Sequence, residues 1–380
     1  MLYRYSKFEL KILLRNYKQL FLGLVIILFF PIYFQIYLDS EPETLLRKKY
    51  AEKETQSIIV NTLPLDLRET EEGEALFKNY TEQLSIINMQ IFYLNSNYGR
   101  EMSEYITEGL RLNELRMEMH ELGNPYVSNK LTIPIEEIEK ENEFLNYLAS
   151  NNLQEEDNPF VTSQFMLTSF DLLSGIFLFL IILIICSDML VYEKAHQTVM
   201  RALPISFATK ATSKILLHFI FISFCLILGI LLGVFRSSTA EGWGNFSYPT
   251  LIYMKDGFVA IPIMKYVSYA LFAICIAIFM TVVLTLILSV FVQNMYGVAL
   301  AGIGVFFLPD LLNILGLKAN FFNPIKYIDV SGVLSGRLAM KFGDVSITYW
   351  NSILSMVLFT IILMGIIYVY HWFLFRGKNS

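Results

Sequence analysis

Hydrophobic residues gather in six long runs along this chain, and they do not alternate with polar residues at helix or strand spacing. Each run covers about 19 residues or more and carries at most one charged residue. At a rise of about 1.5 Å per residue, a helix of that length crosses the roughly 30 Å of hydrocarbon in a bilayer. The predicted spans are Gln19–Leu38, Leu172–Leu190, Ile215–Phe235, Tyr266–Val292, Val298–Leu317 and approximately Tyr349–Phe375.

The fifth run has the weakest pattern, because Pro309 and Asp310 interrupt it. Two interpretations stay open for it, a continuous span and a broken or partly re-entrant helix. The composition agrees with a membrane protein. The 380 residues are 55% hydrophobic and only 17% charged, whereas a soluble globular domain carries about 25% charged residues.

The polar residues collect between the first two runs. Residues 39–164 hold 25 Asp and Glu against 11 Lys and Arg, whereas the rest of the chain holds 9 acidic and 18 basic residues. Helical stretches with one apolar face recur in this segment, and Gly123-Asn124-Pro125 ends one of them. We therefore expect an α-rich domain at 39–165, whose acidic surface is either simply solvated or a site for a cation or a cationic peptide.

The basic residues indicate the orientation. They concentrate before the first run, in 191–214 and at the C-terminus, and the positive-inside rule assigns such segments to the cytoplasm. Six spans with both termini inside are consistent with this, and they leave 39–165 outside the membrane. We expect a multi-pass protein of a bacterial cell membrane.

The first 18 residues carry a stripe of cations that fits one face of a helix. We expect residues 1–18 to form an amphipathic helix in the inner membrane interface, followed by the first span at 19–38. The alternative is a plain cytoplasmic start to that span. The stripe consists of Arg4, Lys7, Lys11, Arg15 and Lys18.

Sequence motifs for catalysis, nucleotide binding or metal binding are absent from the chain. It has no G-x-x-x-x-G-K-[ST] loop, no H-E-x-x-H and no cysteine pair with metal-ligand spacing. Charges in or near the spans are limited to Asp171, Asp188 and Asp310, which do not form a proton relay. We therefore expect no enzyme activity, no cofactor and no metal on this chain, and an external energy source for any transport.

Residues 192–206 separate the second and third spans with a polar, basic segment that Pro204 interrupts. Such a segment can form a short helix along the membrane that docks on a cytoplasmic partner. The alternative is an ordinary basic loop that only obeys the positive-inside rule. The segment reads YEKAHQT at 192–198 and RALPIS at 201–206, and Lys210 and Lys214 follow it.

These residues resemble the permease subunits of type-2 ABC exporters. That family has a basic amphipathic helix before the first of six spans, and a coupling helix of the form E-[KR]-x-x-G-T-x-x-x-L-x-x-x-P-[IV]-S between spans two and three. Here Gln197 stands where the family has glycine, and Leu203 directly precedes Pro204. QNMYG at 293–297 and NPIKY at 323–327 are similar to its turn between spans four and five and to its proline segment before the last span.

The resemblance covers residues 1–38 and 166–380 and implies an all-α polytopic membrane protein with a large extracytoplasmic insertion at 39–165. It implies the permease of an ATP-driven exporter. The long uninterrupted apolar spans leave no obvious hydrophilic path, which favours an amphiphilic substrate, such as a peptide antibiotic, a lipid-like compound or a drug; sodium stays open. ATP and Mg would be bound by two ABC ATPase subunits, and a second permease chain would complete a homodimer or heterodimer in membrane lipid. We expect no nucleic-acid partner, because the net charge is −5 and the basic residues lie next to the membrane. The ATPase-coupling residues it implies are Glu193, Thr198, Leu203 and Pro204.

An alternative from another class is a cell-surface receptor or envelope interaction protein, of the phage-receptor or secretion-component type, without a dedicated ATPase. A receptor has no need for an amphipathic segment at 192–206 that ends in proline. An ATP-binding-cassette gene beside this one would favour the exporter.

Overall fold

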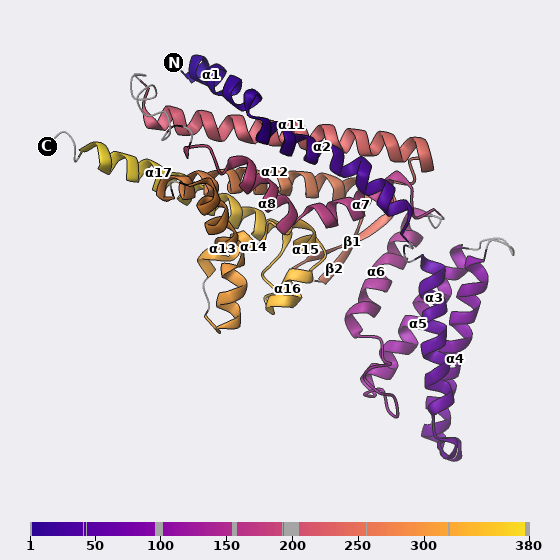
Figure 1. Cartoon of the computed structure of the whole chain (residues 1–380). Helices are drawn as coiled ribbons and strands as arrows, with labels where there is room; N and C mark the ends of the chain where they lie inside the picture. The colour runs from indigo at the N-terminus through magenta and orange to yellow at the C-terminus, as the bar shows by residue number, and fades with distance from the viewer. Residues whose placement is uncertain are drawn as a thin grey trace.

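The structure is a computed structural model of the 380-residue chain. It describes residues 2–40, 42, 44–95, 102–153, 158–191, 193, 205–255, 257–292, 294–317 and 320–376. Figure 1 shows a bundle of long helices, from which a second group of helices projects at one end.

The long helices confirm a polytopic membrane protein. Five of them are long and apolar enough to cross a bilayer, and a sixth crossing is available if a bent pair of helices forms one span. The five are α2 (Tyr17–Leu38), α11 (Phe207–Glu241), α12 (Ile263–Phe291), α13 (Met295–Ile314) and α17 (Tyr349–Arg376).

The second predicted span, Leu172–Leu190, corresponds to this bent pair of helices, and the bend was not predicted. α7 (Thr162–Leu173) and α8 (Ile176–Cys186) meet at 60°. Gly175 lies between them with a φ of 78°, which favours glycine, and its N–H donates to the carbonyl of Ile328 at 3.0 Å. The carbonyl of Ile328 thus replaces the helical acceptor that the Gly175 N–H lacks at the bend. The fifth run, in contrast, forms one continuous helix through Pro309.

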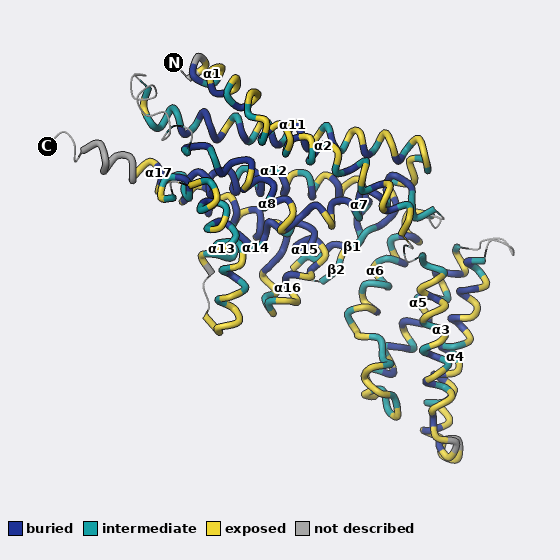
Figure 2. Tube along the Cα trace, viewed as in Figure 1, coloured by how far each residue is buried: buried dark blue, intermediate teal, exposed yellow. Residues whose placement is uncertain are grey.

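α12 forms the centre of the bundle, and α13 lies at its edge. α12 is the most buried of the candidate spans and α13 the least, as the dark and light segments of Figure 2 show. In a bilayer the exposed apolar side chains of α2, α11, α13 and α17 can face hydrocarbon.

α2 and α11 run side by side (Figure 1), and glycines allow them to approach closely. A Cβ atom at Gly229 would lie 2.8 Å from the carbonyl oxygen of Ile26, and one at Gly233 would lie 2.5 Å from the Cβ atom of Phe30. Small residues at helix contacts are typical of membrane proteins, where dense packing must replace the hydrophobic effect.

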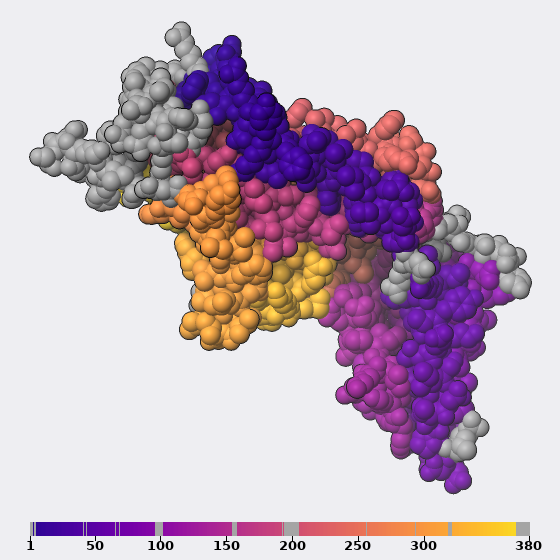
Figure 3. All heavy atoms as spheres, in the orientation of Figure 1, coloured from indigo at the N-terminus to yellow at the C-terminus, as the bar shows by residue number. Residues whose placement is uncertain are grey.

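The projecting helices form the region predicted at 39–165. They pack around small apolar clusters, one of which contains Ile59, Tyr80 and Met119, and Figure 3 shows them extending away from the bundle. An α-rich fold for this segment agrees with the prediction. The helices are α3 (Leu45–Thr62), the 3-10 turn η1 (Leu65–Glu69), α4 (Glu71–Leu94), α5 (Met102–Glu121) and α6 (Ile135–Asn151).

A β-hairpin between α11 and α12 packs against this region, and it was not predicted from the sequence. β1 (Pro249–Met254) pairs antiparallel with β2 (Gly257–Pro262). α6 packs on both strands: Phe144 contacts Tyr248 just before the hairpin, and the Lys140 amine lies 4.4 Å from the ring centre of Phe258. The hairpin is a local addition to an all-α polytopic fold, which agrees with the predicted fold class.

Short helices fill the segment between α13 and α17. They are η3 (Asn320–Phe322), α14 (Asn323–Lys326), α15 (Val330–Leu334) and α16 (Arg337–Phe342). Two of them contact the bundle: α15 packs against α7, α12 and α17, and α14 packs against α13 and α17.

Candidate functional site beside residues 192–206

α1 (Leu2–Arg15) and the beginning of α11 enclose a cluster of buried charges, which we name the junction: Tyr5, Glu9, Glu193 and Lys214. Lys214 Nζ lies 2.9 Å from Glu9 Oε2 and 3.3 Å from Glu193 Oε1. Lys214 and Glu9 are 3% and 5% exposed. Since buried charges are stable only when they are paired, each member of the junction depends on the others.

Tyr5 completes the junction as a hydrogen-bond donor. Its hydroxyl lies 3.0 Å from Glu193 Oε1 and within hydrogen-bond reach of Glu9, so its proton is donated to one carboxylate at a time. Burial raises the pKa of Tyr5, and the two neighbouring carboxylates raise it further. The phenol therefore stays protonated and keeps donating at neutral pH.

The spacing of residues along α1 explains how the junction forms. Tyr5, Glu9 and Leu13 recur every four residues and are buried, which places them on one face of the helix, and α1 packs along α11 (Figure 1). α1 ends at Arg15. Asn16 then caps α2 by accepting a hydrogen bond from the Lys18 N–H at 3.1 Å.

A second polar cluster lies next to the junction around Asp188. Its carboxylate accepts hydrogen bonds from Asn16 Nδ2 at 2.9 Å and Gln19 Nε2 at 3.1 Å. Lys18 Nζ lies 3.7 Å from Asp188 Oδ2 and donates to Ser187 Oγ at 3.0 Å. These contacts join the start of α2 to the residues directly before Glu193.

A cavity of about 280 Å³ lies between the junction and this second cluster. Glu9, Asp188, Lys214 and His218 line its polar side. Gln19 Oε1 is buried and finds no hydrogen-bond partner among the described residues. Two members of the junction, Glu9 and Lys214, therefore border this cavity.

The structure brings one of the four predicted ATPase-coupling residues into this site. Glu193 is a member of the junction. Thr198, Leu203 and Pro204 lie outside the described residues.

The predicted basic stripe divides between two helices. Lys7, Lys11 and Arg15 are exposed on α1, away from its buried face, whereas Lys18 belongs to α2 and turns toward Asp188. Arg4 belongs to α1, and its side chain lies outside the described part of the structure. The helix predicted at 1–18 therefore ends at residue 15, because Asn16 starts a new one.

The sequence analysis missed Tyr5, Glu9 and Lys214 as site residues. One signal was available for Glu9, which is the only acidic residue before position 39 and stands among five basic residues. An acid on the apolar face of a basic amphipathic helix indicates a buried ion pair. No local pattern indicated that its partner is Lys214, which lies 205 positions later in the chain.

The other charges predicted near the spans have partners at the opposite end of the bundle. Asp171, in α7, hydrogen-bonds with Ser331 and lies 3.4 Å from Arg337. Arg337 also pairs with Asp329 at 3.2 Å. Asp310 pairs with Lys341 at 2.8 Å. These contacts fasten the bent pair and α13 to the short helices and have no catalytic arrangement.

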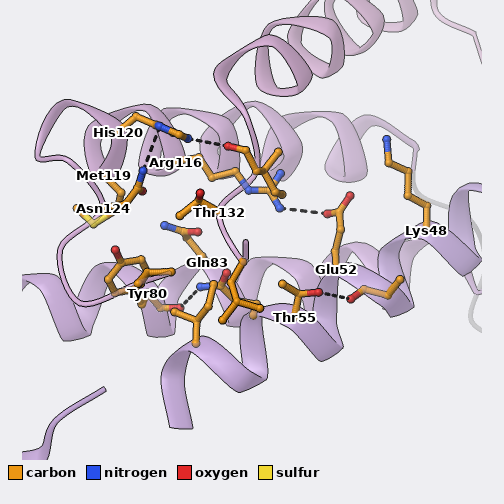
Figure 4. Close-up of a pocket in the computed structure, with 16 residues that line it drawn as sticks. Lys48, Glu52, Thr55, Tyr80, Gln83, Arg116, Met119, His120, Asn124 and Thr132 are labelled. Atoms are coloured by element: carbon orange, nitrogen blue, oxygen red, sulfur yellow. Dashed lines mark hydrogen bonds and ion pairs between the residues drawn. The ribbon is translucent and has the colours of Figure 1, made fainter. Parts of the chain in front are cut away.

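A second cavity, of about 220 Å³, lies within the projecting helices (Figure 4). α3, α4, α5 and the loop after α5 contribute its walls, and Gln83, His120, Asn124 and Thr132 contribute polar groups. His120 Nε2 lies 2.7 Å from the carbonyl of Ile133, and its Nδ1 lies 3.1 Å from Asn124 Nδ2. A proton on Nε2 satisfies both contacts, so the loop is held closely over the cavity.

Four charges, which we name the quartet, lock this region beside that cavity: Lys49, Glu52, Arg116 and Glu141. Lys49 is 0% exposed, and its amine lies 2.6 Å from Glu141 and 3.0 Å from Glu52. Arg116 lies 3.1 Å from each of the same carboxylates. Burial raises the pKa of Glu141, but Lys49 and Arg116 outweigh it and lower that pKa to about 2.

The sites described above hold charge pairs and no nucleophile activated by a base. Within the described ranges, no group of three or more His, Cys, Asp or Glu side chains is arranged to hold a metal ion. No protein-family model, curated protein or solved structure matches this chain.

Proposed function

We propose that this chain is the membrane-spanning permease subunit of a type-2 ABC exporter. In this proposal both termini and residues 192–206 lie in the cytoplasm, and α3–α6 lie outside the cell membrane. Two copies of an ABC ATPase supply the energy from the cytoplasmic side. Two permease chains, identical or different, enclose the path of an amphiphilic substrate.

One observation carries the proposal: the junction attaches the beginning of residues 192–206 to two separate elements. Glu193 is tied to α11 through Lys214 and to α1 through Tyr5. Displacement of this segment by a partner must therefore move α1 and α11 or break a buried ion pair. Breaking such a pair costs about 3–5 kcal/mol, so rigid movement is favoured.

The arrangement of the membrane helices supports the same proposal. α11 packs along α2, and α12 packs between α11 and α17, so the movement of one helix is passed to its neighbours. The described spans show no chain of buried acids or histidines beyond the Asp188 cluster, and an external ATPase is consistent with that.

Co-purification tests the proposal. The chain would be produced together with candidate ATP-binding-cassette subunits and isolated through a tag on this chain. Vanadate-sensitive ATP hydrolysis would then be measured in nanodiscs. We expect the ATPase to co-purify and to turn over. Leu203→Asp should abolish co-purification, whereas Glu193→Gln should keep it and reduce the stimulation of ATP hydrolysis by transport substrate.

Glu139→Gln is the matched control, because Glu139 is an exposed acid on α6, one of the projecting helices. Failure of every ATPase to co-purify, or native behaviour of Leu203→Asp, would refute the exporter. The receptor class of function would then take its place, and residues 192–206 would be an ordinary basic loop.

A further inference from the structure

A groove on the projecting helices combines an apolar floor with an acidic rim. It has a volume of about 650 Å³, and the described residues that line it belong to α4, α5 and the turn after α5. Leu76, Leu115 and Met119 contribute to the floor, and Glu72, Glu82 and Glu118 contribute the acids. Lys78 is the one basic residue of the lining, so the charge of the groove is negative.

Large apolar side chains stand open to solvent at one end of this groove. Leu122 is 59% exposed and Tyr126 is 62% exposed, and both belong to the lining. Exposed apolar surface next to polar residues is typical of a binding site. An occupant that covered these side chains would remove apolar surface from water.

The turn that carries these side chains is fixed without any ligand. The Asn124 amide contacts His120 at 3.1 Å, and the Tyr80 hydroxyl donates to the carbonyl of Pro125 at 3.4 Å. Tyr126 holds a φ of 64°, which costs free energy in a residue that is not glycine. A preformed groove binds with a smaller entropic penalty than one that must fold around its ligand.

The charges select the class of occupant. Glu118 accepts a hydrogen bond from Asn79 at 2.9 Å and Glu82 pairs with Arg111, so both carboxylates are held in position. They do not converge with Glu72 as metal ligands, since no such group of three occurs within the described ranges. Separated carboxylates over an apolar floor fit cations distributed along a chain better than they fit a single ion.

We propose that this groove binds a cationic, amphipathic peptide segment. The residues from Glu72 to Glu82 extend over about 15 Å of helix, which matches four to five residues of an extended peptide at about 3.3 Å each. Alternating basic and apolar residues would point their cations to the rim and their apolar side chains to the floor. The excess of 25 acidic over 11 basic residues in 39–164 would raise the association rate.

Fluorescence anisotropy on the full chain in phosphatidylcholine nanodiscs measures this binding, with empty nanodiscs as the blank. The probe is a labelled six-residue peptide that alternates lysine and leucine. We expect saturable binding that weakens at least tenfold in 0.5 M NaCl. A glutamate–leucine peptide should not bind, and a lysine–serine peptide should bind at least fivefold more weakly.

Two triple variants separate the groove from general charge attraction. Glu72→Gln, Glu82→Gln and Glu118→Gln together should raise the Kd at least tenfold. The control carries the same loss of charge on exposed acids outside the groove and should change the Kd less than twofold. Its substitutions are Glu54→Gln, Glu139→Gln and Glu143→Gln.

Equal weakening by both triple variants would overturn the proposal, because it would show attraction to net charge alone. Absence of saturable binding would overturn it as well. If the groove variant loses helical content, Leu122→Ser with Tyr126→Ser takes its place, because both side chains are exposed; native affinity in that variant would also refute the groove.

A role of the groove in contacting export cargo rests on the exporter proposal. Peptide binding itself is measured on the chain alone, without an ATPase. Loss of ATPase co-purification with intact peptide binding would refute the exporter only. Intact ATPase coupling with no peptide binding would refute the groove only.

Discussion

Removal of Lys49 from the quartet is the most quantitative test of the structure. Lys49→Met keeps the apolar stem of the side chain and deletes its charge. Glu52 and Glu141 then share a single cation, Arg116, in a site where Lys49 is fully buried. A buried ionic cluster that loses one partner is destabilised by about 3–5 kcal/mol.

This magnitude agrees with the pKa of Glu141. The surroundings of this carboxyl group lower its pKa from 4.5 to about 2. At about 1.4 kcal/mol for each tenfold change in proton affinity, that difference corresponds to roughly 3 kcal/mol of stabilisation of the ionised form. Of the two cations, Lys49 lies closer to that carboxylate and accounts for a large part of this stabilisation.

Hydrogen exchange followed by mass spectrometry on the full chain in nanodiscs measures the effect. The amides of α3 and α6 exchange when their region opens, and a loss of 3 kcal/mol accelerates that exchange by a factor of about 150. We expect Lys49→Met to accelerate exchange in α3 and α6 at least 100-fold and to leave α12 unchanged. Lys53→Met, on the same helix and with its side chain half-buried, should change exchange less than threefold.

The double variant Lys49→Met with Glu141→Gln decides between charge and packing. It restores neutrality, because Arg116 then faces Glu52 alone, and it should recover at least 2 kcal/mol of the loss. An acceleration below fivefold in Lys49→Met would refute the stabilising role of the quartet. A double variant no better than the single one would show that packing, and not charge, explains the loss.

Three further predictions follow from the geometry. Because the pKa of Glu141 is depressed in the folded state, the stability that this group contributes is complete above about pH 4.5 and is lost as the pH falls toward 2. Circular dichroism should therefore show a loss of helix between these pH values, and Glu141→Gln should weaken this pH dependence. Lys214→Met should lower the unfolding temperature in detergent, and the added substitution Glu9→Gln should restore part of it; no recovery would refute the ion pair. Gly229→Val should cost about 1–3 kcal/mol by forcing α2 from α11, whereas Gly365→Ala, with open space around it, should leave heated size-exclusion profiles unchanged.

The membrane helices were predictable because hydrophobic length is a local property of the sequence. The runs near α2, α11, α12 and α17 needed no partner to be recognised. The bend at Gly175 depends on a carbonyl at position 328, and no local pattern marks such a contact. Pro309 had the opposite effect: a local helix breaker is accommodated inside the continuous helix α13.

The hairpin and the charge clusters escaped prediction for related reasons. The residues of β1 and β2 are apolar, β-branched and aromatic, and they adjoin a membrane run, so the two patterns merge in the sequence. Lys49 and Glu141 lie 92 positions apart, and surface acids outnumber the buried ones in the same helices. The sequence indicates which segments are acidic, but only the three-dimensional fold shows which acid pairs with which base.

α11 has a mechanical consequence that follows from its length. Its 35 residues extend about 52 Å, well beyond the roughly 30 Å of hydrocarbon. One end carries Lys214 of the junction, and the other is tied to the start of α7 by the hydrogen bond from the Thr162 N–H to the carbonyl of Gly242 at 3.1 Å. A rod of that length works as a lever: a tilt of about 5° displaces its far end by roughly 4–5 Å. In the proposed exporter, a small push at the junction would thus become a displacement at the opposite end, where the chain enters from α6.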